Sequence, residues 1–209
     1  MAKKRVYLHI GPAVPGVHAP HAALRDSEAL ETAGLAAPKV DQAEMDCADV
    51  EVRRRHKAHG LRRRDVEGAW AEVCRRAFKK AHQGYDVVIS QPGFAEADYQ
   101  QVALALDGLV GLQLHLVVTP GGDLHEGELR ALVGEWAKFV RKEGRVHVLA
   151  LDPGTTPEEF TREIARLALR EEQSQLERRL LDLTRQRSRL RLRLGRVGAA
   201  PRSDDADAA

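Results

Sequence analysis

Four short apolar runs divide the chain, and each has the pattern of a strand buried in a sheet. They are residues 5–10 (RVYLHI), 86–90 (DVVIS), 113–119 (QLHLVVT) and 145–151 (RVHVLAL). Their nearly continuous apolar character predicts that both faces of each strand are covered, as in a parallel sheet.

The stretches between these runs have helical periodicity. A first helix is predicted from Pro20, which suits a first turn, to the residue before Gly34, and a last helix follows Thr156 as its N-cap. Residues 35–64 are less regular, and no helix or strand is assigned to them. Three further helices are predicted, at residues 65–83, 95–109 and 126–142. Because strands that alternate with helices are joined by right-handed crossovers, we predict an α/β fold with a mainly parallel sheet flanked by helices.

The loop after the first strand, HIGPAVPGVH, has the glycine spacing of a phosphate-binding loop, G-x-x-x-x-G. Ligands of such folds bind beyond the carboxyl ends of the strands, where this loop begins. A working loop continues with Lys and Ser or Thr, whereas this chain has Val and His. The candidate anion-binding residues of this degenerate loop are therefore Gly11, Gly16, Val17 and His18. A protonated His18 could bind an anion.

The order of segments resembles that of bacterial, in particular actinobacterial, P-loop sulfotransferase-like proteins. The resemblance covers residues 5–167 and is carried by RVYLHIG, GAWAEVCRRA, DVVISQPGF, LHLVVTPGGDL and RVHVLALDPGTTPEEFTREIARL. It implies a P-loop-type parallel sheet. It also implies transfer of a sulfuryl group from 3′-phosphoadenosine 5′-phosphosulfate to a hydroxyl or an amine.

The chain departs from the family pattern at each position that binds this donor. Val14 stands at the lysine position, and Val17 and His18 stand where the family has Thr or Ser. The third strand is followed by residues 119–122 (TPGG) without the arginine that holds the 3′-phosphate. A Ser-His-Glu-like site after the second strand corresponds to residues 90–92 (SQP). We therefore assign no catalytic residue and expect no cofactor, unless an atypical anion site, with Arg25 or another arginine in place of the lysine, still binds the donor.

A dense basic segment, RRRHKAHGLRRR at residues 53–64, stands out in a chain whose formal net charge is only +2. It could contact nucleic acid or another polyanion, or it could be a solvated face. It contains no aromatic residue on which bases could stack. The candidate polyanion-binding residues are Arg53, Arg54, Arg55, Arg62, Arg63 and Arg64.

The histidines predict no metal site. Zinc takes three or four protein ligands, and neither histidine pair has a third ligand at a recognisable spacing. The pairs are favoured as solvated, and two strand histidines as buried and hydrogen-bonded. The residues concerned are the pairs His18/His21 and His56/His59 and the strand residues His9 and His115.

Two cysteines, Cys47 and Cys74, have the spacing of neither a metal site nor a disulfide framework. No apolar run has the length of a membrane span or of a secretory leader. We therefore predict a cytoplasmic protein without a membrane partner.

The C-terminal part of the chain has a coiled-coil pattern. Leucine recurs every seven residues from residue 169, and the intervening a positions are Gln173, Leu180, Arg187 and Leu194. The leucines of the predicted seam are Leu169, Leu176, Leu180, Leu183, Leu190 and Leu194. This pattern favours self-association, or association with another helical protein, through residues 169–194. The alternative is one amphipathic helix that folds back on its own domain.

The charges beside the seam disfavour a parallel homodimer, because Glu172 would face Glu177 and Arg187 would meet itself. An antiparallel pair or a different partner chain would relieve both conflicts. We divide the chain into a sulfotransferase-like domain (1–168), a coiled-coil-like helix (169–195) and a disordered acidic tail (196–209). The hypothesis that these features favour is a sulfotransferase-like protein that has lost activity and acts as an association or scaffold protein. The alternatives are an active transferase with an atypical anion site and a polyanion-binding or nucleic-acid-binding protein.

Overall fold

The computed structural model of the chain forms two compact units, Met1–Arg166 and Leu167–Ala209. The first boundary predicted from the sequence, at residue 168, lies two residues from the boundary between these units. The structure describes residues 3–11, 17–25, 27–120, 126–140, 143–152 and 154–197. The tail predicted to be disordered lies, from residue 198 on, outside the described residues.

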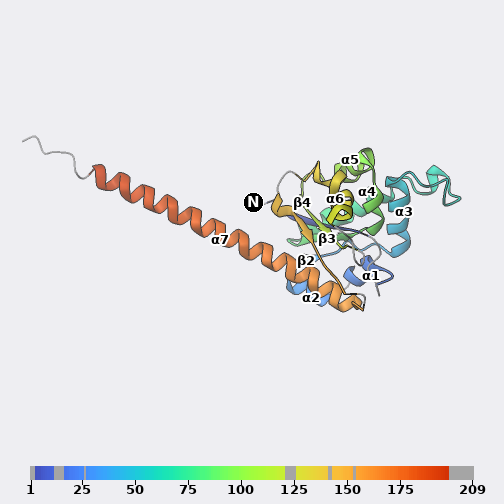
Figure 1. The fold of residues 1–209 in the computed structure, drawn as a ribbon, viewed down its shortest axis with the longest axis horizontal. Helices are drawn as coiled ribbons and strands as arrows, with labels where there is room; N and C mark the ends of the chain where they lie inside the picture. The colour runs from blue at the N-terminus through green and yellow to red at the C-terminus, as the bar shows by residue number, and fades with distance from the viewer. Residues whose placement is uncertain are drawn as a thin grey trace, which may run out of the picture. The chain divides into compact units, whose positions relative to one another are not determined.

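The first unit is built on a five-stranded, all-parallel sheet with the order β2-β3-β1-β4-β5 (Figure 1). This confirms the predicted α/β class and the parallel sheet. The strands are β1 (Arg5–Ile10), β2 (Leu35–Ala36), β3 (Asp86–Ser90), β4 (Gln113–Val118) and β5 (Val146–Val148). Central strand β1 pairs with β3 on one side and β4 on the other, which places His9 level with Ser90 and Val117.

One face of the sheet carries the main apolar core. Alternate residues of β1, Val6, Leu8 and Ile10, point into this core together with the buried rings of Trp70 and Trp136. The helices that cover this face are α3 (Gln42–Val52), α4 (Ala69–His82), α5 (Tyr99–Asp107) and α6 (Glu126–Ala137). Short 3-10 turns, η1 (Arg63–Asp65), η2 (Pro92–Glu96) and η3 (Glu143–Arg145), join these elements.

The opposite face of the sheet is covered by short helices and by the first turns of the last helix. These are α1 (Pro20–Arg25), α2 (Glu28–Thr32) and the Pro157–Arg166 part of α7 (Pro157–Val197). The ring of Phe160 packs against His9 with 5.1 Å between centroids, and the Thr161 hydroxyl donates a hydrogen bond to the Ala23 carbonyl at 3.3 Å. The two covered faces explain why the strands are apolar at nearly every position.

Capping side chains account for two errors of the sequence prediction. The first helix is not continuous, because the Ser27 hydroxyl accepts a hydrogen bond from the Leu30 amide and starts α2 anew. Residues 35–64 are not irregular throughout, because Asp41 and Glu44 form a reciprocal capping box that starts α3. The prediction also missed β2, extended β5 at both ends and carried α6 too far.

The predicted start of the last helix is confirmed. Thr156 accepts a hydrogen bond from the Glu159 amide at 3.2 Å, and the Glu159 carboxylate accepts one from the Thr156 amide at 2.9 Å. Helix α7 then runs for 41 residues, and the second unit contains its part from Leu167 to Val197.

Candidate functional site

Three polar side chains meet where β3, β1 and β4 end, at the edge of a parallel sheet that usually binds ligands. His9 Nδ1 lies 2.7 Å from Ser90 Oγ, and His9 Nε2 lies 2.9 Å from Thr119 Oγ1. All three residues are buried. Both ring nitrogens of His9 are therefore used within the protein, which confirms the prediction of a hydrogen-bonded core histidine.

The cluster carries no positive charge at neutral pH. Burial lowers the pKa of His9 from 6.5 to about 3, because the imidazolium would lose its hydration among these neutral groups. A phosphate or sulfate group needs cations or a set of free backbone N–H donors. The cluster of His9, Ser90 and Thr119 supplies hydroxyl groups and a neutral ring that already bond to one another.

Gly11, the first glycine of the candidate phosphate loop, lies against the strand beside it. Its φ of +146° is in the region that favours glycine, and an added Cβ would lie 2.4 Å from the Thr119 carbonyl oxygen. Its amide donates to the Pro92 carbonyl at 3.4 Å. This glycine is thus explained by a close approach of two backbone segments within the fold.

Of the other candidate residues of that loop, the two that the structure describes, Val17 and His18, lie in different surroundings. The Val17 side chain is buried and His18 is exposed, while Gly16 lies outside the described residues. Val14, at the lysine position, also lies outside them.

Gln91, in the segment after the second predicted strand, forms hydrogen bonds that hold the fold together. Gln91 is buried, and its side-chain amide donates to the Met45 carbonyl at 2.6 Å. Its backbone amide donates to the His9 carbonyl at 2.9 Å. Gln91 therefore ties α3 to the edge of the sheet and has no acidic or basic group for catalysis.

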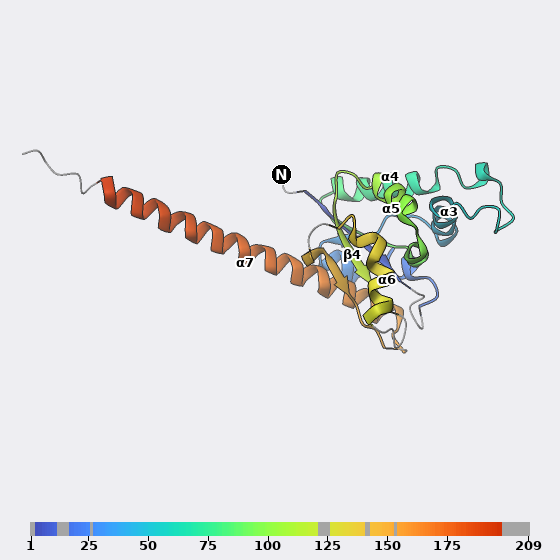
Figure 2. The ribbon, with the colours of Figure 1, turned by 45° about the horizontal axis from the view of Figure 1, so that its top comes forward.

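The basic segment between α3 and α4 extends beyond α3 (Figures 1 and 2). The side chain of its first arginine, Arg53, is only 10% exposed and forms ion pairs with Asp49 at 2.6 Å and with Glu96 at 2.5 Å. Arg55 also reaches Glu96, at 3.1 Å. Arg53 thus ties the start of the segment to α3 and η2, and its guanidinium is already paired with carboxylates rather than free to contact a polyanion.

The second group of arginines also has acidic neighbours. Arg62 and Arg64 lie 3.3 Å and 3.9 Å from carboxylate oxygens of Asp65, and Arg63 lies 3.8 Å from Glu67. Arg54, with a left-handed φ of 56°, lines a surface hollow of about 530 Å³ in which Glu51 and Glu67 also lie. Because carboxylates of neighbouring residues lie beside these arginines, the surface around the segment presents both signs of charge.

The two histidines of the first pair, His18 and His21, lie in different surroundings. His18 is exposed, whereas His21 is buried and its Nε2 donates to the Pro38 carbonyl at 3.2 Å. Burial lowers the pKa of His21 to about 4. The prediction that both histidines of this pair are solvated is therefore wrong for His21, which belongs to the core.

A histidine contact that the sequence did not indicate lies on β4 and β5. His115 Nδ1 is 3.0 Å from His147 Nε2, and the two rings stack with 5.3 Å between centroids. The register of β4 and β5 creates this contact. Within the described residues of the first unit these imidazoles are two ligands at most, fewer than zinc requires.

A hollow of about 670 Å³ lies between the end of β5 and the first turns of α7. Its charged lining consists of three carboxylates, Asp152, Glu159 and Glu163, and two arginines, Arg162 and Arg166. The excess of carboxylates opposes the binding of a polyanionic nucleotide there.

The second unit presents its leucines to solvent. Side chains of the predicted seam are between 48% and 69% exposed, namely Leu169, Leu176, Leu180, Leu183 and Leu190. The side chain of Leu194 lies outside the described residues. A repeated exposed leucine is unusual on a soluble helix and marks a surface that another apolar surface can cover.

Comparison with protein-family models, with curated proteins and with solved structures finds no match to this chain. The class that the structure defines is therefore an α/β protein with an all-parallel sheet and a long C-terminal helix. None of the described helices is both long enough and apolar enough to span a bilayer.

Proposed function

We propose that this chain is a sulfotransferase-like protein that has lost sulfuryl transfer and acts by associating with other chains through residues 169–194. The observation that carries the proposal is the row of exposed leucines at heptad positions of α7. Burying a fully exposed leucine is worth about 1.5–3 kcal/mol, and each of these leucines still has roughly half or more of that burial to gain. A seam of several leucines can therefore hold two helices together in water.

The chemistry at the sheet edge supports the loss of transfer. The family arrangement uses a lysine, hydroxyl groups and an arginine around its donor, and the corresponding residues here include Val14, Val17 and Thr119. A charge-assisted contact to phosphate contributes about 1.5–3 kcal/mol, so three missing contacts weaken donor binding by roughly a thousandfold or more. His9, neutral at pH 7, does not replace the missing charge.

Association is tested by the mass of the full chain in light scattering, with two matched substitutions. Leu180→Glu places a charge in the seam, whereas Leu181→Glu places the same charge on a leucine that is 57% exposed but outside the seam. We expect an oligomer that Leu180→Glu weakens by at least about 100-fold in dissociation constant and that Leu181→Glu leaves intact. A monomeric full chain at 100 µM or equal effects of the two substitutions would refute association through the seam.

Loss of donor binding is tested by calorimetry with 3′-phosphoadenosine 5′-phosphosulfate. We expect no heat of binding at micromolar concentrations. Micromolar binding that a Gly16→Val substitution abolishes would instead favour the active transferase with an atypical anion site.

The proposal assigns the protein to the cytoplasm. Both cysteines are free, and the buried Cys74 thiol has no disulfide partner, which suits a reducing compartment.

A further inference from the structure

The charge of α7 is unevenly distributed along the leucine seam. Residues 169–181 contain three arginines and three glutamates and are neutral. Residues 182–194 contain five arginines and one aspartate, a net charge of +4. Two copies in parallel would set these two positive segments side by side, whereas antiparallel copies set each positive segment beside a neutral one. The charge distribution therefore favours antiparallel pairing at any register that overlaps the two halves.

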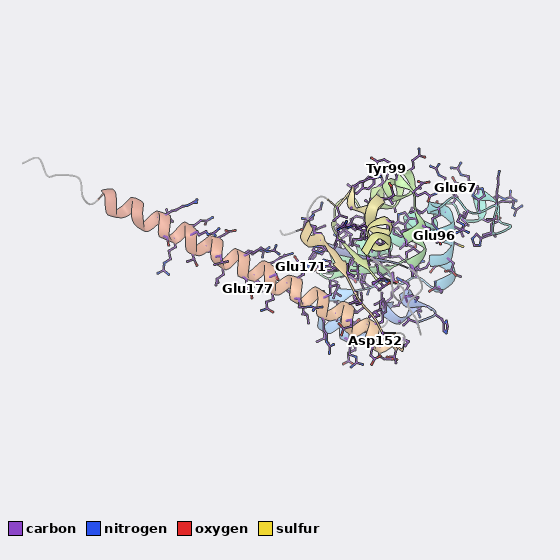
Figure 3. The ribbon with its side chains drawn as sticks, in the orientation of Figure 1. Glu67, Glu96, Tyr99, Asp152, Glu171 and Glu177 are labelled. Atoms are coloured by element: carbon purple, nitrogen blue, oxygen red, sulfur yellow. The ribbon has the colours of Figure 1, made fainter. Side chains whose placement is uncertain are left out.

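Individual heptad positions favour the same orientation. In a parallel pair, Glu172 would face Glu177 of the second copy, and Glu177 carries an exposed carboxylate (Figure 3). Arg187, at an a position, would meet its own copy in the seam. A parallel pair would therefore contain two repulsive Glu172–Glu177 contacts beside the seam and one repulsive Arg187–Arg187 contact within it.

An antiparallel register exists that relieves these conflicts and still pairs leucines at the centre. With Leu180 opposite Leu183 of the second copy, the helices overlap along the whole seam. Arg187 then lies opposite Leu176, and Gln173 lies opposite Leu190. The methylene groups of an arginine can cover a leucine while the guanidinium remains in water.

We infer that the surface formed by the leucine seam binds a second copy of this chain, antiparallel, with Leu180 opposite Leu183 of the second copy. This inference rests on the proposed association through α7 and specifies its partner and orientation. The two chains enter the paired helices from opposite ends. At a rise of 1.5 Å per residue, the two copies of Leu169 lie about 38 Å apart along the axis.

Cross-linking between differently tagged chains tests this orientation. The full chain carries Cys47→Ser, which removes the partly exposed thiol, and either Leu180→Cys or Leu183→Cys. A mixture of the two variants is equilibrated and oxidised. We expect disulfides between residue 180 of one variant and residue 183 of the other, at least about tenfold above the like-with-like dimers of either variant. Ser188→Cys, outside the seam on the same helix, gives the background level.

The outcomes separate this inference from the proposed function. Like-with-like disulfides at either position indicate a parallel pair and overturn the inference, as does a dimer that gives no disulfide above the Ser188→Cys background. Both results leave association through α7 standing. A full chain that is monomeric by light scattering overturns both proposals.

A spin-label distance tests the orientation without altering the seam. Ser174→Cys, in the Cys47→Ser background, carries the label on an exposed position of α7. The antiparallel register separates the two labelled residues by about 22 Å along the axis, and a parallel pair sets them at the same level. The lateral separation of the two helices adds to this axial distance, so a distance distribution centred below about 22 Å would overturn the inference.

Discussion

Lowering the pH from 7 to 5 is expected to destabilise the first unit by about 4 kcal/mol through two buried histidines, His9 and His21. Burial lowers the pKa of His9 to about 3 and that of His21 to about 4, against 6.5 for an exposed imidazole. Well above pH 6.5 both rings are neutral in the folded and in the unfolded chain, so they add no pH dependence there. Below pH 6.5 only the unfolded chain takes up the protons, and stability falls until the folded pKa values are reached.

The magnitude follows from the distance between the working pH and the unfolded pKa. A solution at pH 5 is 1.5 pH units below the unfolded pKa of 6.5. The free energy of unfolding therefore falls by about 2 kcal/mol for each histidine. Most carboxylates still keep their charge at pH 5, so the loss between pH 6.5 and pH 5 reports mainly on histidines. The ion pairs of the first unit contribute their own pH dependence at lower pH.

Urea unfolding followed by tryptophan fluorescence measures this effect on the first unit. The only two tryptophans, Trp70 and Trp136, are both buried in its core, so α7 beyond Arg166 does not contribute to the signal. His21→Gln keeps an N–H donor for the Pro38 carbonyl and should reduce the loss between pH 7 and pH 5 by about 2 kcal/mol. His59→Gln, on an exposed histidine, should leave the loss unchanged. A free energy of unfolding that is constant between pH 7 and pH 5 would refute the reasoning, and so would an unaltered slope in His21→Gln.

Three further substitutions or reagents test other contacts of the first unit. Gly11→Ala should lower the free energy of unfolding by at least about 2 kcal/mol, because its Cβ would lie 2.4 Å from the Thr119 carbonyl oxygen; an unchanged urea midpoint would contradict this contact. Gly93→Ala should cost about 1–3 kcal/mol, because its Cβ would lie 2.3 Å from a carboxylate oxygen of Asp49; a smaller loss in the Asp49→Asn background would identify that contact as the cause. Burial raises the pKa of the Cys74 thiol to about 12, so a thiol reagent at pH 8 should modify this cysteine only after unfolding, and rapid modification of the folded chain would contradict its burial.

The strands of this fold could be predicted closely because burial on both faces leaves a strong signal. β1 and β3 have the predicted bounds, and β4 differs by one residue. The two residues of β2 were missed because so short a strand has no periodicity of its own. Helix α3 was missed because its apolar residues gather only weakly on one side, although the capping box of Asp41 and Glu44 could have indicated its start.

The contacts of the site could be predicted only in part, because they depend on the order of strands in the sheet. Sequence reasoning identified His9 as a buried, hydrogen-bonded residue. Its partners Ser90 and Thr119 are 81 and 110 residues away, and only the order β3-β1-β4 brings them to one edge. The ion pairs of Arg53 were missed for a similar reason, since Glu96 lies 43 residues further along the chain.

The two units differ in how far their leucines are exposed to water. In the first unit, leucines such as Leu8 and Leu116 are fully buried, because the sheet and its helices cover each other's apolar side chains. In the second unit, five heptad leucines remain about half exposed or more, although each would gain free energy from burial. A long helix with a largely charged surface draws little stability from its own backbone hydrogen bonds, because helix propensity alone is marginal in water. The exposed heptad leucines of α7 therefore support a helix that pairs with a second helix over a helix without a partner. The proposed association depends on this difference in leucine exposure between the two units.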